Sequence, residues 1–198
     1  MHKGRLEAFS DGVLAIVITI MVLEFKVPHQ AELAALRPLV PVAISYVLSF
    51  VHVGIYWNNH HHMLQATRHV GGNILWANLH LLFWLSLVPF VTAWMGENHF
   101  APVPTAAYGV VLLCAAVSYS ILQRVILATP GTGTVLPAAL GRDVKGKLSV
   151  VIYAAAIPLS LLRPWLGSLL YAAVALLWLA PDRRIERAVG EAAPPGAA

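Results

Sequence analysis

Residues 5–28 of the chain read RLEAFSDGVLAIVITIMVLEFKVP, and this stretch decides the fold. It places a carboxylate, Asp11, at the start of an apolar run that extends from Val13 to Leu23. Because a charge interrupts the start and no small-x-small cleavage site follows, the stretch is not typical of a cleaved signal peptide. A membrane-spanning helix needs roughly 20 predominantly apolar residues. The stretch therefore predicts a transmembrane helix over about residues 6–26.

The composition of the whole chain is as apolar as this first stretch. Of its 198 residues, 59% are apolar and only 11% are charged, and the mean hydropathy is +0.72. An average soluble domain has about 25% charged residues. A chain this apolar lacks the polar residues that would cover its own core, so it requires lipid as its solvent. It predicts an all-α polytopic membrane protein, with the lipid bilayer and not nucleic acid as its partner, and argues against a soluble enzyme, a secreted scaffold or a disordered chain.

Further apolar segments follow the first. The six predicted transmembrane helices cover about residues 6–26, 38–59, 73–95, 104–127, 147–163 and 165–181. Prolines inside these segments are expected to kink a helix or to mark its end, and they are Pro41, Pro89 and Pro158. We assign residues 1–187 to a single six-helix transmembrane domain and the Ala/Gly/Pro-rich residues 188–198 to a disordered tail.

Positively charged residues are distributed unevenly between the two ends of the predicted helices. Ten lie on the side of the two termini: Lys3, Arg5, Arg68, Arg124, Arg142, Lys145, Lys147, Arg183, Arg184 and Arg187. The opposite side has three: Lys26, Arg37 and Arg163. Because cytoplasmic loops are enriched in Lys and Arg, this distribution predicts a multi-pass protein of the cell (inner) membrane with both termini in the cytoplasm.

Asp11 is an unusual residue for a membrane helix, because insertion scales assign a carboxylate there a cost of at least ~2.5 kcal/mol. One interpretation is a residue at the start of the first helix, near the interface, with Ser10 as a local cap. The other is a polar network with the second helix, which closes on the same side with the sequence WNNHHH at residues 57–62. Its indole and imidazole groups are suitable donors for a carboxylate. The residues leave both interpretations open, and also which of His60 and His61 bonds to Asp11.

Helix geometry separates Asp11 from a stripe of residues further along the first helix. The residues that recur at the spacing of one helix face are Ile16, Thr19, Ile20, Leu23 and Val27. Asp11 lies about 140° around the helix from Ile16, so it would face different neighbours. Periodicity alone favours an ordinary lipid-facing or core surface for the stripe, because a helix that is apolar all round does not reveal a functional face.

The first helix resembles that of a known channel family. Arg5, Phe9, Ser10 and Asp11 form the pattern Arg-x-x-x-Phe-Ser-Asp, which is similar to the signature of the transmembrane protein 175 family of lysosomal potassium channels and their bacterial relatives. Further blocks agree in order and spacing: YWNNHHH at residues 56–62, LWANL at residues 75–79 and PFVTAWMGE at residues 89–97. The resemblance covers the first half of the chain, whereas the second half matches only as a hydropathy profile.

This resemblance implies an all-α subunit of six transmembrane helices that assembles as a homotetramer, with the first helix of each subunit lining a central pore. It implies permeation by K⁺ and other monovalent cations, without a cofactor or a tightly bound metal. It also implies that no carbonyl selectivity filter is present, which agrees with the lack of a Thr-Val-Gly-Tyr-Gly loop in this sequence.

The resemblance further assigns roles to individual residues. It places the narrowest apolar constriction of the pore gate at Ile16, with Ile20 and Leu23 further along the same face. It places a hydroxyl layer, where transient K⁺ would lie, at Thr19. The remaining motif residues would form a structural network that ties the first helix to its neighbours: Arg5, Phe9, Ser10, Asp11, Trp57, Asn59, His60 and His61.

Two other functions are alternatives to a channel. A proton-coupled secondary transporter would use Asp11 and the histidines at the membrane interface, with His60 completing a proton relay. A haem or di-iron enzyme would need paired or clustered histidines. The chain lacks the repeated histidine boxes of di-iron membrane oxidases, and His52 with His80 is the pair that could hold a haem. We therefore expect a channel and not an enzyme.

Overall fold

The computed structural model describes residues 2–65, 67, 70–129 and 143–179. All regular secondary structure in these ranges is helical, which confirms the predicted all-α class. In chain order the elements are α1 (Lys3–Ile20), η1 (Met21–Glu24), η2 (Leu33–Leu39), α2 (Val40–Gln65), α3 (Gly72–Ser86), α4 (Val88–Glu97), α5 (Pro102–Leu127), α7 (Val144–Leu162) and α8 (Pro164–Leu179). The 3-10 helix η1 extends α1, and the 3-10 helix η2 leads into α2.

Five helical segments in the described part of the chain are long and apolar enough to cross a membrane. They are Lys3–Glu24, Leu33–Gln65, Gly72–Glu97, Pro102–Leu127 and Val144–Leu162. A further apolar helix, α8, has 16 residues in the described range, fewer than the roughly 20 of a typical span. The predicted end of this segment at residue 181 and the predicted tail at 188–198 lie outside the described residues. These segments are those of a multi-pass membrane protein.

The second helix extends beyond its predicted end at residue 59. α2 continues to Gln65, so His60 and His61 lie inside the helix instead of closing it. Side chains in this last part bond within the helix: Asn59 donates to the backbone carbonyl of Ile55 at 2.8 Å, and Gln65 bonds to His61 at 2.8 Å. Bonds between residues four apart satisfy these polar groups on the helix itself, and therefore the polar run does not end it.

The prolines predicted to disturb the helices have different outcomes. The third predicted segment is interrupted at Leu87, and Pro89 lies in the first turn of α4, where its missing N–H removes no helical hydrogen bond. Pro41 lies in the first turn of α2. Pro158 lies inside α7, which continues to Leu162. Two of the prolines therefore mark helix starts, whereas the third does not end its helix.

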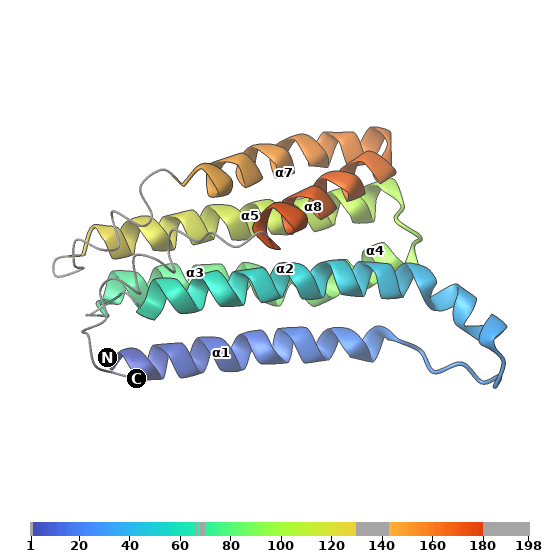
Figure 1. Ribbon diagram of the computed structural model, residues 1–198, viewed down its shortest axis with the longest axis horizontal. Coiled ribbons are helices and arrows are strands. Elements are labelled where there is room, and N and C mark those ends of the chain that lie inside the picture. The colour runs from blue at the N-terminus through green and yellow to red at the C-terminus, as the bar shows by residue number, and fades with distance from the viewer. Residues whose placement is uncertain (1, 66, 68–69, 130–142, 180–198) are drawn as a thin grey trace.

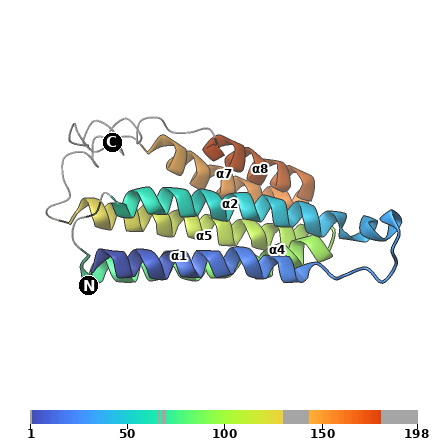
Figure 2. The ribbon, with the colours of Figure 1, turned by 60° about the horizontal axis from the view of Figure 1, so that its bottom comes forward.

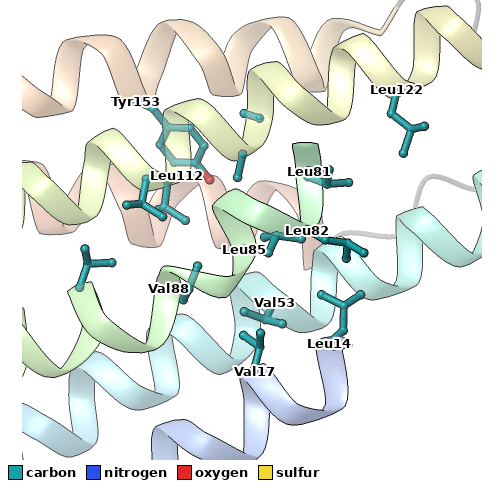
Figure 3. Packing of buried hydrophobic residues seen from close by; sticks show 14 of the residues in the cluster. Leu14, Val17, Val53, Leu81, Leu82, Leu85, Val88, Leu112, Leu122 and Tyr153 are labelled. Atoms are coloured by element: carbon teal, nitrogen blue, oxygen red, sulfur yellow. The ribbon is translucent and has the colours of Figure 1, made fainter. Parts of the chain in front are cut away.

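The helices form a bundle in which α5 packs against α3, α4, α7 and α8. Figures 1 and 2 both show α1 at one edge of the bundle, with α7 and α8 at the opposite edge. Figure 3 shows how Leu14 and Val17 of α1 point toward Val53 of α2 and the leucines of α3. Because α1 packs mainly against α2, α3, α4 and its own extension η1 among the described elements, its opposite face is left largely exposed within the subunit.

Candidate functional site

The first helix has one face that is buried against the rest of the subunit. Its fully buried residues recur every three or four positions, which is the spacing of a single helix face. They are Leu6, Ser10, Leu14, Val17 and, in η1, Met21, each at most 4% exposed. Burial of this face fixes the rotation of α1 about its own axis, and therefore also fixes which residues point away from the bundle.

The residues of the predicted stripe point away from the bundle. Ile16 is 64% exposed, Ile20 is 45% exposed and Leu23 is 74% exposed, and Thr19 between them is exposed as well. We call this surface, Ile16, Thr19, Ile20 and Leu23, the outward face of α1. It continues toward the start of the helix through Phe9, which is 51% exposed, and the exposed Arg5.

The hydroxyl of Thr19 is held in one orientation on this outward face. Its Oγ1 donates to the backbone carbonyl of Ala15 at 2.9 Å and lies 3.1 Å from that of Ile16. Because its single hydrogen is used within the helix, the oxygen keeps its lone pairs free for a group outside the helix. A hydroxyl oriented in this way can accept a hydrogen bond or contact a cation.

On the buried face, Ser10 belongs to a chain of hydrogen bonds that joins three helices. The side-chain amide of Asn78 on α3 donates to Ser10 Oγ at 3.0 Å. Its Oδ1 lies 2.6 Å from Nε2 of His60 on α2, and since an amide oxygen only accepts, the imidazole N–H is the donor. Ser10 and Asn78 are fully buried and His60 is 2% exposed. Buried polar groups are stable only when paired, and therefore this chain fixes α1 against α2 and α3 at one depth.

Asp11 makes a separate contact with α2. Its carboxylate accepts a hydrogen bond from the indole N–H of Trp57 at 3.0 Å, and the Trp57 ring stacks on the imidazole of His61, with ring centroids 6.0 Å apart. Because α1 begins at Lys3 and Ser10 is not its cap, the interpretation of Asp11 as a helix-start residue is wrong. Within the described residues neither histidine bonds to Asp11: His60 bonds to Asn78, and His61 bonds to a glutamine of its own helix.

Some residues of the predicted structural network take no part in the contacts that Ser10 and Asp11 make with α2 and α3. The side chain of Asn59 bonds to its own helix, and its backbone carbonyl lies 3.5 Å from the hydroxyl of Tyr119 on α5. Arg5 and Phe9 lie on the outward face of α1 instead. Asn78, conversely, is central to the buried chain of hydrogen bonds, although the sequence analysis assigned it no role of its own. The signal for it is an amide side chain inside an otherwise apolar segment, which needs a partner within the bundle.

An ion pair ties the other end of the first span to α4. Lys26 Nζ lies 2.8 Å from the Glu97 carboxylate, and both side chains are exposed. The hydrogen bond and the charge of Glu97 raise the pKa of Lys26 above its ordinary value. A groove beside this pair runs along α4 and is lined by Ile20, Glu24 and the exposed ring of Phe90. The outward face of α1 therefore continues directly onto an aromatic surface of α4.

Of the remaining histidines, His52 and His80 are the pair considered above for a haem. His52 is buried on α2 beside Tyr108 and Tyr153, whereas His80 is exposed on α3 and accepts a hydrogen bond from Trp84 at 3.1 Å. These two histidines thus face different surroundings and do not make a haem pair. The described residues also contain no group of three or more His, Cys, Asp or Glu side chains that could hold a metal ion.

The chain is similar in sequence and in structure to proteins described as potassium channels. The family described as endosomal/lysosomal potassium channel TMEM175 matches residues 5–89. A potassium channel of Chryseobacterium sp. (strain P1-3) is 51% identical over 191 residues, covering 96% of this chain and 100% of that protein. A potassium channel of Streptomyces collinus is 35% identical over 129 residues, covering 61% of this chain and 63% of that protein. The crystal structure of a lysosomal potassium-selective channel TMEM175 homolog from Chamaesiphon minutus matches with a TM-score of 0.76 at 28% identity, covering 91% of this chain and 97% of that one.

Proposed function

The chain belongs to the TMEM175 family of ion channels, and we propose that it is a potassium-permeable cation channel whose pore is lined by the outward face of α1. The members to which it is similar are channels and not enzymes, so it is not an enzyme. The observation that carries the proposal is the two-sided character of α1. Its buried face is fixed by packing and by the Ser10 hydrogen bond, while Ile16, Thr19, Ile20 and Leu23 on the outward face stay exposed within the described subunit.

Four copies of the subunit, each with six transmembrane helices including α8, would enclose such a pore. The position of α1 at the edge of the bundle supports this assembly, because an edge helix can approach a symmetry axis without rearranging the other helices (Figure 2). The adjoining groove on α4, with the exposed rings of Phe90 and Trp94, gives a neighbouring subunit an aromatic surface next to the pore face. Aromatic side chains of this kind are enriched at protein interfaces.

The orientation in the membrane follows from the positions of the basic residues. Lys3 at the start of α1 donates to the backbone carbonyl of Gln65 at the end of α2, at 2.7 Å, so these two ends lie together. Arg124 near the end of α5 and Lys147 near the start of α7 belong to the same predicted side of the membrane. We assign this end of the bundle to the cytoplasm, with both termini there and the protein in the cell (inner) membrane.

The proposed gate is a ring of four Ile16 side chains. A narrow ring of branched apolar side chains expels water and thereby blocks ions without a plug. Ile20 and Leu23 extend the apolar lining along the same face, one and two helical turns further on. Opening then requires only a small rotation or outward tilt of α1 that widens and rewets the ring. No carbonyl filter takes part in this mechanism.

Thr19 is the proposed cation layer, because its oxygen keeps free lone pairs on the pore face. A hydroxyl dipole is weak beside a stack of carbonyls, so the selectivity it gives is modest. We expect Thr19→Val to lower the K⁺/Na⁺ permeability ratio by about two- to fivefold, which corresponds to about 0.4–1 kcal/mol. Reversal potentials under bi-ionic conditions measure this ratio. Thr19→Ser, which keeps the hydroxyl, is the control; equal losses in both variants would contradict the assignment.

Asp11 has a structural role in this proposal and does not contact the permeating ion. We expect Asp11→Ala to reduce the fraction of tetramer on size-exclusion chromatography, because it loosens α1 from Trp57 by about 1 kcal/mol, the net value of a typical hydrogen bond. The remaining tetramers should keep the wild-type preference between K⁺ and Na⁺. Trp57→Phe keeps an aromatic ring but loses the N–H donor, and should act in the same direction. A fully assembled Asp11→Ala tetramer with altered ion preference would contradict this role.

A proton-coupled transporter is the alternative function, based on Asp11 and the interfacial histidines. The hydrogen bonds argue against a direct relay, because His60 donates to Asn78 while Asp11 accepts from Trp57. Purified protein in liposomes with a K⁺ gradient tests both functions by comparing the fluxes of K⁺, Na⁺, Rb⁺ and Cs⁺. A channel gives flux that requires no pH gradient and grows with ion concentration. Saturable cation flux with stoichiometric proton movement would reject the channel.

A further inference from the structure

A small cavity lies inside the subunit, between α2, α5, α7 and α8. Its volume is about 40 Å³, and its walls include His52 and Tyr56 of α2, Ala116 of α5, Tyr153 of α7 and Trp178 of α8. No residue of α1 lines the cavity. It is therefore distinct from the outward face of α1, and the inference drawn from it does not depend on where the pore lies.

His52 lies on the wall of this cavity and carries a buried polar atom that has no partner among the described residues. The side chain is 3% exposed, and its Nδ1 lies 2.9 Å from the backbone carbonyl of Leu48. Because a carbonyl only accepts, Nδ1 carries the proton, and the Nε2 of the neutral ring then has a lone pair and no hydrogen. Within the described residues Nε2 is the buried side-chain atom left without a hydrogen-bond partner. A buried acceptor of this kind requires a donor.

We propose that this cavity is a water-binding site, in which bound water donates a hydrogen bond to Nε2 of His52. A water molecule needs about 10–15 Å³ of cavity volume, so this cavity of about 40 Å³ has room for about three water molecules. It is too small for a drug-sized ligand, whose pockets measure about 300–1,000 Å³. A buried water is stable when it has two to four polar partners. The wall also includes Asn59, whose amide N–H bonds to the Ile55 carbonyl, and Ser149, whose Oγ donates to Lys145 and accepts from Trp178, so their remaining acceptor capacity is what they offer to water.

The cavity is elongated along the bundle. Its wall runs from His52 to Asn59 on α2 and from Tyr153 to Gly146 on α7, which is about 10 Å along each helix at 1.5 Å per residue. Gly146 lies in the first turn of α7, at the end of the bundle where that helix begins. Water that enters from this end would reach His52 well inside the transmembrane part of α2, away from the face assigned to the pore.

Solid-state NMR on the full chain in lipid bilayers, with histidine labelled by ¹⁵N in the ring, tests the proposal. His52 is assigned by the signal lost in His52→Gln. We expect an unprotonated Nε2 and transfer of magnetisation from water to that nitrogen, as at His29, which is exposed between η1 and η2 outside the membrane-spanning segments. The absence of water transfer to His52 in the wild type, or a ring protonated at Nε2 and not at Nδ1, would overturn the proposal.

A cavity-filling variant separates water in this cavity from water elsewhere. Ala116→Leu places a larger side chain on the cavity wall, and we expect loss of water transfer to His52 while transfer to His29 persists. Val117→Leu, on the adjacent exposed position of α5, is the matched control and should keep the His52 signal. Equal transfer to His52 in the two variants would show that the water is not in this cavity. Should Ala116→Leu fail to fold, the wild-type measurement alone decides the proposal.

Discussion

Replacing Ile16 with asparagine is expected to raise the K⁺ flux of the reconstituted protein by about tenfold or more, which corresponds to lowering the barrier by about 1.4 kcal/mol. The reason is that an amide in place of a branched apolar side chain gives water a hydrogen-bonding partner at the constriction. A ring of four such amides stays wet when the helices are closed, so the gate no longer excludes ions. Ile16 is 64% exposed and makes no essential contact within the subunit, and therefore the variant should fold.

The control for this experiment is the same substitution at an exposed apolar position away from the outward face of α1. Ile44 on α2 is 55% exposed and lies in an apolar groove between α2 and α8. Ile44→Asn introduces the same polar group at similar exposure, so it reports any general leak that an asparagine causes. Liposome flux assays at equal protein density measure both variants. Unchanged flux in Ile16→Asn, or equal increases in the two variants, would remove Ile16 from the gate.

The neighbouring residues of the outward face provide a graded test of the same mechanism. Ile20 and Leu23 lie one and two turns from Ile16 and lengthen the apolar lining of the proposed pore. Substituting either with asparagine should increase flux less than Ile16→Asn, because the narrowest ring remains apolar and continues to exclude water. This ordering depends on the position of each residue along the helix and not on its exposure alone, since Leu23 is more exposed than Ile16.

Sequence reasoning predicts the helices of this protein well and their contacts poorly, for a physical reason. Hydropathy is a local property of about 20 residues, so the apolar segments and their order can be read directly. The rotation of a helix depends on partners far away in the chain. The bond between Ser10 and Asn78 joins residues 68 positions apart, and that between His60 and Asn78 joins residues 18 positions apart. Nothing in the periodicity of α1, α2 or α3 indicates either bond.

The outward face of α1 is a second feature that sequence periodicity alone does not identify. Periodicity groups Ile16, Thr19, Ile20 and Leu23 on one stripe, but most other residues of α1 are apolar as well. The stripe is distinguished only when the opposite face is known to be buried through Leu14 and Val17. Likewise, the end of α2 depends on side-chain bonds within the helix, which composition does not reveal.

The largest effect on stability is expected for Asn78→Leu. This change keeps a side chain of similar size but leaves the N–H of His60 without its acceptor, and a buried unpaired donor costs about 1–3 kcal/mol. Unfolding by SDS in mixed micelles measures the loss. Asn73→Leu is the matched control, because Asn73 is an exposed residue near the start of the same helix, and it should change little.

A double variant tests whether the effect of Asn78→Leu arises from the unpaired imidazole or from packing. In Asn78→Leu/His60→Leu the donor is removed together with its acceptor, and replacing both partners by apolar groups can be nearly neutral. We therefore expect the double variant to be more stable than Asn78→Leu alone, which additive losses would not produce. Additive losses, or equal destabilisation by Asn78→Leu and Asn73→Leu, would show that this hydrogen bond does not hold α1, α2 and α3 together. If the bond does hold them, it also keeps the outward face of α1 turned toward the proposed pore.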